Sequence, residues 1–170
     1  MQSYDVTQKL LGFLEANKVK FQTYFHPACR TSVESSAARQ SAGAPEAIGA
    51  KALLVKMNLV SGEEKFYLLI LPGPLRIDEK LLKATVPNLK RFRFAYADEL
   101  GLVLDGLVPG SVPPFGNIIF SKLDDMIIDQ KIFDYPYIGF NAGCLEKSIV
   151  MEASEYRRIS TNILIADFAK

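Results

Sequence analysis

A loop rich in glycine and proline, and a lysine at the start of an apolar segment, are the features of this sequence best suited to chemistry. The loop, Asp105 to Gly116, holds three glycines and three prolines in twelve residues. Proline fixes φ and glycine permits φ > 0, so this loop is stiff and can bring backbone N–H groups close to a ligand. Lys51 opens an otherwise apolar segment and could hold a carbonyl or phosphate oxygen. A surface connection and a lysine snorkelling into water are the structural alternatives.

The single histidine and the two cysteines are weaker candidates. His26 precedes Cys29 by three residues, so the two could form a local Cys–His pair, although a histidine in a local hydrogen bond is the simpler interpretation. Cys29 and Cys144 belong to no CxxC or CxxH arrangement, which argues against structural zinc. GxxxxGK[ST], GxGxxG, HExxH and GxSxG motifs are also absent. We therefore expect no metal and no cofactor.

Charge limits the ways in which this chain could bind nucleic acid. With 20 basic and 19 acidic residues, the net charge is +1, which excludes binding through bulk positive charge alone. Basic residues cluster moderately at Lys90, Arg91 and Arg93, where two phenylalanines interleave with them. This cluster could contact nucleic acid, and the solvated face of an amphipathic strand explains it equally well.

Length and hydropathy predict one globular unit. The chain has 170 residues, of which 49% are hydrophobic, so it can bury a sizeable core. The longest apolar stretches are strand-sized, and no signal-peptide pattern opens the sequence. We expect a single domain over residues 1–170 in the cytoplasm, with neither a membrane nor DNA as a partner.

Periodicity and capping signals predict the elements that position these residues. Thr31-Ser-Val-Glu34 fits a capping box, so a helix should begin there and run to about Gln40. Ser154 could cap a terminal helix. Strands are expected at residues 51–57 and 65–71, as a hairpin, and at 91–95, 117–120, 126–128, 137–141 and 148–151. Without strict βαβ alternation, the fold class is α/β (α+β), with a mixed, largely antiparallel curved sheet and packed helices.

Several short motifs follow one another in order between about Phe25 and Met151. They are Phe25-His-Pro27, Ala50-Lys-Ala-Leu-Leu-Val55, Leu71-Pro72 with Arg76-Ile-Asp78, Arg93-Phe-Ala95, Gly110-Ser-Val-Pro-Pro-Phe-Gly116 and Phe140-Asn-Ala-Gly143. In this order they resemble the YbaK/ProX family of trans-editing deacylases and prolyl-tRNA synthetase editing domains. The strongest motif, at residues 110–116, matches the GxxxP loop of that family.

The resemblance implies a YbaK-like fold and hydrolysis of the ester that joins a wrong amino acid to tRNA. Backbone N–H groups near Gly110, Ser111 or Gly143 could then stabilise the oxyanion, and the substrate's free ribose hydroxyl could place the water. The implied site residues are Lys51, Gly110 and Asn141 for catalysis; Ser111, Pro113, Pro114, Phe115, Gly143 and His26 for substrate binding; and Lys90, Arg91 and Arg93 for tRNA binding.

The resemblance leaves the substrate and the activity open. The loop sequence is most similar to the branch acting on alanyl-tRNA(Pro), so an Ala- or Cys-tRNA(Pro) class is expected, with the acceptor end as partner and prolyl-tRNA synthetase as a further candidate. A non-catalytic tRNA- or synthetase-binding module is the first alternative. A thiol-dependent hydrolase built on Cys29 and His26 is the second.

Overall fold

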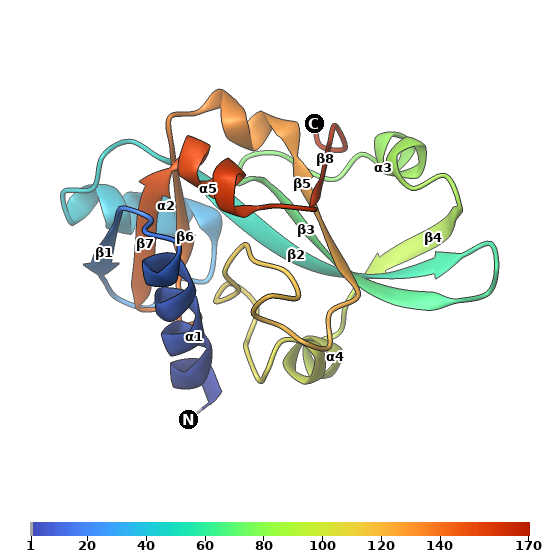
Figure 1. The fold of residues 1–170 in the computed structure, drawn as a ribbon, viewed down its shortest axis with the longest axis horizontal. Coiled ribbons are helices and arrows are strands. Elements are labelled where there is room, and N and C mark those ends of the chain that lie inside the picture. Colours follow the sequence, from blue (N-terminus) through green and yellow to red (C-terminus); the bar gives the residue numbers. More distant parts are fainter. Residues whose placement is uncertain (1) are drawn as a thin grey trace.

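The computed structural model describes residues 2–170 as an open, mixed sheet of eight strands with five helices packed against it (Figure 1). The strand order is β1-β7-β6-β2-β3-β5-β8, with β4 paired to β2 beside this path. The longest pairings are antiparallel, whereas β2/β6, β3/β5 and β5/β8 are parallel. The predicted fold class is confirmed. The strands are β1 Phe21–Phe25, β2 Ile48–Leu59, β3 Glu64–Pro72, β4 Leu89–Phe94, β5 Asp125–Asp129, β6 Tyr137–Asn141, β7 Lys147–Glu152 and β8 Leu164–Ala166.

Strand β2 joins the two parts of the sheet. One of its edges pairs with β3 from Ala50 to Asn58. Its other edge pairs with β6 only at Ile48 and Gly49, and with β4 only from Val55 onward. Between these pairings, residues 50–53 have no strand partner on that edge within the described part of the chain. An unpaired stretch of a central strand leaves main-chain groups for other partners, and here it borders a pocket.

The helices follow from local signals in the sequence. In α2, the Thr31 hydroxyl accepts a hydrogen bond from the N–H of Glu34, whose carboxylate accepts one from the N–H of Thr31, so the predicted capping box is confirmed. Asp78 caps α3 in the same way through the N–H of Leu81. The helices are α1 Gln2–Ala16, α2 Ser32–Ser41, α3 Glu79–Thr85, α4 Ala97–Val103 and α5 Ala153–Ile159, with a 3₁₀ turn, η1, at Gln130–Asp134.

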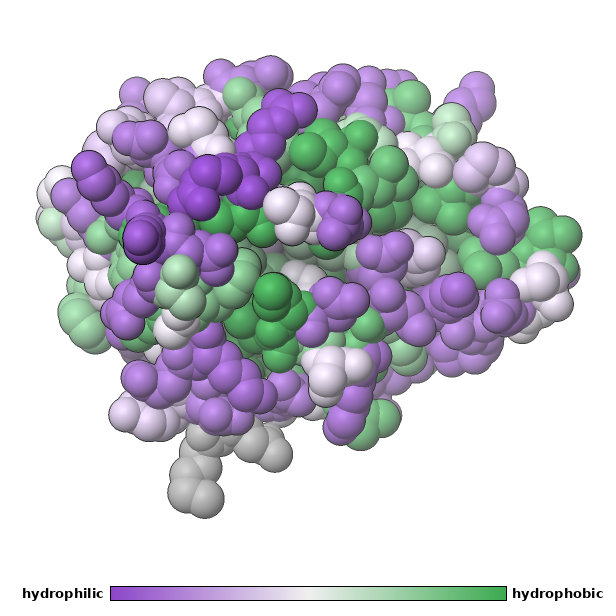
Figure 2. Space-filling view, viewed as in Figure 1, coloured by the Kyte–Doolittle hydropathy of each residue, from purple (hydrophilic) through white to green (hydrophobic). Residues whose placement is uncertain are grey.

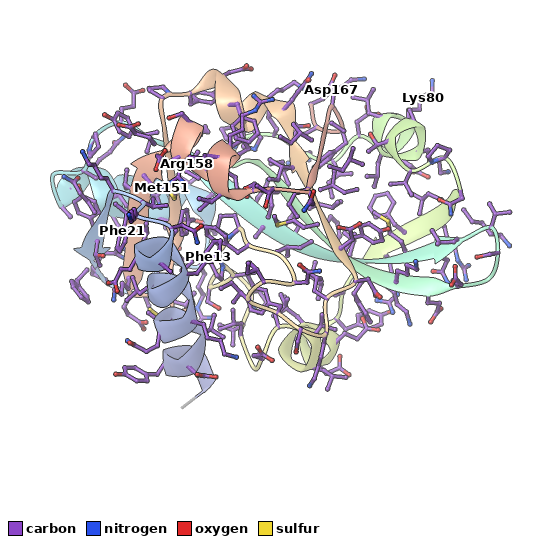
Figure 3. All side chains as sticks on the ribbon, viewed as in Figure 1. Phe13, Phe21, Lys80, Met151, Arg158 and Asp167 are labelled. Atoms are coloured by element: carbon purple, nitrogen blue, oxygen red, sulfur yellow. The ribbon has the colours of Figure 1, made fainter. Side chains whose placement is uncertain are left out.

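Both faces of the central strands are buried. In β3, Leu68 and Ile70 belong to the larger apolar cluster, whereas Leu69 and Leu71 belong to a second cluster beneath α3. Side chains alternate between the two faces of a strand. A strand that is buried on both faces therefore needs consecutive apolar residues, as β3 has from Leu68 to Leu71. Phe21 of β1 pairs with Met151 of β7, and both residues belong to or pack against the larger apolar cluster. Figure 3 labels both side chains, close to α1.

The face of the molecule in Figure 2 has a mainly hydrophilic rim, and hydrophobic residues emerge towards its middle. In residues 2–170, none of the helices combines the length and the apolar character needed to cross a bilayer.

Two expectations about elements are wrong, and one strand was not predicted. Residues 117–120 form a turn and not a strand, because the N–H groups of Ile119 and Phe120 both donate to the carbonyl of Gly116. Both side chains are buried, so their apolar character reflects packing and not pleating. Helix α5 begins at Ala153 and has Glu152, not Ser154, as its N-cap residue. Strand β8 has only three residues and was not predicted.

A forked ion pair fixes the connection between β4 and α4. Both oxygens of Glu99 accept hydrogen bonds from the Arg93 guanidinium at 2.7 Å, and Oε2 also accepts one from the N–H of Tyr96 at 2.9 Å. The Arg93 guanidinium stacks over the Tyr96 ring at 4.1 Å. These hydrogen bonds, that of Arg93 first, lower the pKa of Glu99 to about 2.

Replacing Glu99 should weaken the protein in a pH-dependent way. Because folding lowers this pKa, the ionised carboxylate stabilises the fold at neutral pH, and the stabilisation disappears as pH falls from about 4.5 towards about 2. We predict that Glu99→Gln lowers the thermal midpoint near pH 7 and that the difference from wild type shrinks below pH ~4.5. Melting curves across this range test the prediction. Glu46→Gln, at an exposed residue, is the control. If the melting-temperature difference between Glu99→Gln and wild type did not depend on pH, the prediction would be wrong.

Candidate functional site

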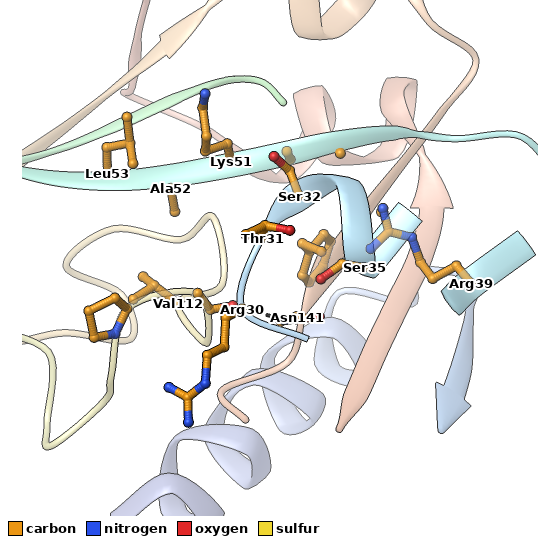
Figure 4. A pocket seen from close by; sticks show the side chains of 16 residues that line it. Arg30, Thr31, Ser32, Ser35, Arg39, Lys51, Ala52, Leu53, Val112 and Asn141 are labelled. Carbon is orange, nitrogen blue, oxygen red and sulfur yellow. Dashed lines mark hydrogen bonds between the residues drawn. The ribbon is translucent and has the colours of Figure 1, made fainter. Parts of the chain in front are cut away.

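A pocket of about 350 Å³ opens where the second edge of β2 lacks a strand partner (Figure 4). Four segments form its walls: one face of α2 with the two residues before it, the first half of β2, the loop around Gly110 and the end of β6. One wall is apolar, while hydroxyl, amide and guanidinium groups line the other. The lining residues are Arg30, Thr31, Ser32, Ser35, Arg39, Gly49, Ala50, Lys51, Ala52, Leu53, Pro109, Gly110, Val112, Gly139, Phe140 and Asn141.

The Gly/Pro loop lines this pocket through Pro109, Gly110 and Val112. Gly110 has φ +88°, and a Cβ atom there would lie 2.7 Å from the Arg30 carbonyl oxygen. The backbone conformation and the contact with Arg30 therefore both require glycine. This close approach places the loop against the chain that leads into α2.

The other predicted residues of the loop do not line the pocket, and the contacts of Ser111, Pro114 and Phe115 hold the loop in place. The Ser111 hydroxyl donates to the Val108 carbonyl at 2.8 Å, and the Tyr156 hydroxyl donates to the Pro114 carbonyl at 2.7 Å. Phe115 is buried, with its ring edge-on to three aromatic neighbours. Substrate binding by Ser111, Pro113, Pro114 and Phe115 stays a prediction.

Two of the three backbone N–H groups expected to bind an oxyanion already have acceptors. The N–H of Ser111 donates to Val108, and that of Gly143 donates to the Ser111 carbonyl at 3.0 Å. Within residues 2–170, the N–H of Gly110 has no such acceptor. Gly110 is therefore the member of this group that remains available to a ligand.

A chain of polar side chains connects the loop to His26. Asn141 donates through Nδ2 to the Gly110 carbonyl at 2.8 Å, and its Oδ1 accepts from the Ser148 hydroxyl at 2.9 Å. Ser148 Oγ lies 2.7 Å from His26 Nε2. Asn141 lines the pocket, whereas His26 lies behind it and acts on the loop through Ser148 and Asn141.

Lys51 lines the pocket from β2, and its side chain points to the other side of the strand from Ala52, Val112 and Asn141 (Figure 4). Its ammonium is anchored there by backbone carbonyls. Nζ donates to the oxygens of Gly73 at 3.0 Å and Leu75 at 2.6 Å. An ammonium has three donors, so one remains for a ligand. Burial, and then the charge of Arg76, lower the pKa of Lys51. The predicted lysine is thus half-buried and held on the loop after β3.

Helix α2 supplies the polar wall, which sequence reasoning did not predict. Ser32, Ser35 and Arg39 recur at intervals of three and four residues, so they share one helical face. Arg39 is 3% exposed and Ser35 is 6% exposed. The signal that could have revealed them is this spacing, because the capping box fixes where the helix starts and therefore which residues face β2 and β6.

Cys29 does touch His26, with 3.6 Å between Sγ and Nδ1. Its thiol nevertheless donates to the Pro27 carbonyl at 3.2 Å, which keeps it protonated. Burial first, and then the charge of Glu34, raise the pKa of this thiol. Cys29 also lies outside the pocket lining, so the geometry favours a structural thiol over a nucleophile. Among residues 2–170, no three His, Cys, Asp or Glu side chains form a group that could hold a metal ion.

The predicted basic cluster lies on β4, away from the pocket. Arg91 pairs with Asn58 and Arg93 with Lys56 in the β2/β4 register, so they lie five to seven residues along β2 from Lys51. At the usual rise of a strand, this separation is roughly 17–23 Å. Lys90 and Arg91 are exposed, whereas Arg93 is engaged by Glu99.

Comparison with known proteins matches this arrangement to a family. The model of the aminoacyl-tRNA editing domain matches residues 26–159, which include every segment that lines the pocket. The chain belongs to the aminoacyl-tRNA editing domain family. The resemblance drawn from the motifs is thereby confirmed, and at the level of this family so is the expectation of an aminoacyl-tRNA hydrolase.

Similar proteins match nearly the whole length of this chain. The multifunctional Ser/Thr-tRNA deacylase ProXp-y of Escherichia coli K12 is 29% identical over 161 residues, which cover 93% of this chain and 90% of that protein. The crystal structure of a hypothetical protein has a TM-score of 0.76 at 20% identity and covers 95% of this chain and 99% of its own. A crystal structure described as a proposed trans-editing enzyme for prolyl tRNA synthetase has a TM-score of 0.73 at 23% identity and covers 97% of both chains. At these identities the two structures show the fold alone.

Replacing Gly110 should be more harmful than replacing other glycines. We predict that Gly110→Ala lowers the free energy of unfolding by about 1–3 kcal/mol, because φ is positive and the Cβ meets the Arg30 carbonyl. Relief of this strain would shift the loop and lower the deacylation rate. Gly12→Ala in α1 is the matched control, since its Cβ would meet nothing within 4 Å. Equal stability and equal rates for the two variants would contradict the prediction.

Proposed function

We propose that this pocket hydrolyses, in trans, the ester of a tRNA mischarged with a small amino acid. The observation that carries the proposal is that Lys51, Gly110 and Asn141 all line one pocket in a chain of the editing domain family. Lys51 and the Gly110 N–H supply donors, and Asn141 fixes the loop that carries Gly110. A single domain over residues 1–170 would suffice for this reaction.

The reaction needs no protein nucleophile. Water attacks the acyl carbon, the carbonyl oxygen becomes an oxyanion, and the C–O bond to the ribose breaks while the ribose oxygen takes up a proton. The free N–H of Gly110 would stabilise the oxyanion, and the third donor of Lys51 would bind a carbonyl or phosphate oxygen of the substrate. The neighbouring ribose hydroxyl of the substrate would orient the water. His26, Ser148 and Asn141 would act indirectly, because their hydrogen bonds hold the Gly110 carbonyl.

The lining favours hydroxylated amino acids over the alanine or cysteine class predicted from the loop. Ser32, Ser35 and Arg39 line one wall, while Ala52 and Val112 line the other. Hydrogen-bonding groups in a pocket reject a substrate that lacks the matching hydroxyl much more strongly than an apolar wall rejects an added one. The E. coli relative, a Ser/Thr-tRNA deacylase by name, agrees with this choice. We therefore propose Ser- or Thr-tRNA first, with Ala- and Cys-tRNA(Pro) as the competing class.

The body of the tRNA would lie across β4. With the acceptor end in the pocket, the exposed Lys90 and Arg91 are close enough for phosphates of the acceptor stem, roughly 20 Å away along β2. Arg93 contributes less, because Glu99 already neutralises it. Prolyl-tRNA synthetase is a candidate partner, since a protein of the same fold is described as acting with it.

Loss of Lys51 should separate catalysis from folding. We predict that Lys51→Ala lowers the deacylation rate about 10²-fold, as expected for loss of one charged donor to the substrate, with little change in the melting temperature. The measurement is a panel of Ser-, Thr-, Ala- and Cys-charged tRNAs, including tRNA(Pro). Lys56→Ala, on the same strand but paired with Glu64, is the control and should retain the wild-type rate. Full activity of folded Lys51→Ala would contradict the role, and inactivity of the wild type on all substrates would favour the non-catalytic binding module.

Charge reversal on β4 should weaken tRNA binding without altering the chemistry. We predict that Lys90→Glu/Arg91→Glu lowers tRNA affinity. The slope of log K against log salt concentration should also become shallower, by about 1 for each phosphate that the variant no longer binds. The rate at saturating tRNA should be unchanged, because the pocket is distant. Filter binding across salt concentrations tests this, with Lys80→Glu/Lys83→Glu on α3 as the control. Unchanged affinity and salt slope would place the tRNA elsewhere.

A further inference from the structure

Arg39 is a buried cation without a partner. Its side chain lies in the last turn of α2, is 3% exposed and lines the pocket (Figure 4). Its Nη2 atom is buried and has no hydrogen-bond acceptor. Among residues 2–170, no carboxylate forms an ion pair with it. A guanidinium stays charged in proteins, so its burial here is expensive unless something neutralises it.

The surrounding backbone is shaped to admit this guanidinium. Gly49 of β2 and Gly139 of β6 pair with each other in the parallel register. A Cβ on Gly139 would lie 2.5 Å from Arg39 Nε, and one on Gly49 would lie 3.7 Å from Nη2. The two glycines thus form a slot in which the guanidinium rests on the sheet. Neither has a positive φ, so the space for Arg39 accounts for glycine at position 139.

Within residues 2–170, no acidic side chain neutralises the charge of Arg39. Burial lowers the pKa of Arg39, and Cys29, a protonated thiol in this structure, is the group that acts in the opposite direction. The missing partner is therefore expected from the pocket. A planar guanidinium binds a carboxylate through two parallel hydrogen bonds, which suits a small planar anion in a pocket of about 350 Å³.

We propose that Arg39 is the centre of a carboxylate subsite that binds the free amino acid released by the reaction. This inference rests on the proposed function. Hydrolysis breaks the bond between the acyl carbon and the ribose oxygen, adds the water oxygen to that carbon and leaves an acid that loses its proton. The carboxylate would pair with Arg39, while Ser32 and Ser35 bind the hydroxyl of serine or threonine and Ala52 and Val112 contact its carbon atoms. The product should therefore compete with mischarged tRNA.

Binding of free amino acids tests the subsite without any deacylation assay. We expect serine and threonine to raise the melting temperature of the wild type, whereas serinol and serinamide, which lack the carboxylate, do not. Arg39→Met should lose this shift, with affinity at least about tenfold weaker by calorimetry. Arg157→Met, which removes an exposed arginine outside the pocket lining, is the matched control and should retain the shift. Phosphate at equal ionic strength distinguishes a general anion site from a carboxylate site.

Stability of the unliganded variants excludes a purely structural role. Replacing an unpaired buried charge by an apolar side chain should leave the melting temperature of Arg39→Met equal or higher, whereas a structural arginine would lower it. Gly139→Ala provides a second variant, because its Cβ displaces Arg39 without removing the charge, and it should also weaken serine binding.

Four results would overturn the subsite: no response of the wild type to any carboxylate, an equal response to serinamide, a preference for phosphate, or unchanged binding in Arg39→Met. Carboxylate binding by a protein that deacylates no tRNA would refute the proposed function alone. Deacylation without carboxylate binding would refute the subsite alone. The two proposals therefore fail separately.

Discussion

The structure depends on the way in which β2 is shared between two parts of the sheet. Its pairing with β3 is continuous, but β6 and β4 contact opposite ends of its other edge. The interval between them, residues 50–53, is where main-chain groups face a pocket instead of a strand. A sheet that was fully paired here would have no site. The Gly/Pro loop and α2 close around this interval and convert an unpaired strand edge, ordinarily a hazard for aggregation, into a binding surface.

Two kinds of glycine shape the site, and they do so for different reasons. Gly110 is required by its backbone angle and by contact with Arg30, so it fixes the path of the loop. Gly139 is required because the Arg39 guanidinium lies against it, and a Cβ atom there would displace this guanidinium from the pocket wall. Between these walls, Asn141 follows Gly139 by two residues on β6 and bonds to the Gly110 carbonyl. The same short strand therefore holds the loop and makes room for the cation.

Local signals predicted most of the fold and the parts of the site that come from single segments. The capping box located α2, the apolar runs located β2 and β3, and Lys51 and Gly110 were identified from their own neighbourhoods. Arg39 was missed because its meaning lies in contacts with β2 and β6, far away in the sequence. The turn at residues 117–120 was assigned wrongly because burial, not strand pairing, accounts for Ile119 and Phe120. Pairings between distant segments are what a single sequence does not reveal.

The chain of hydrogen bonds from His26 to Gly110 has a consequence for how this protein reaches its active form. His26 and Ser148 are 122 positions apart, and Asn141 and Gly110 are 31 apart. Closing such long loops is slow in folding, because the entropy of closure comes before the contacts that repay it. The site should thus be among the last features to form and among the first to be disturbed by partial unfolding. Activity would then report the integrity of the chain from His26 to Ser148, and a fragment that lacks either end of this span should not retain a partly working pocket.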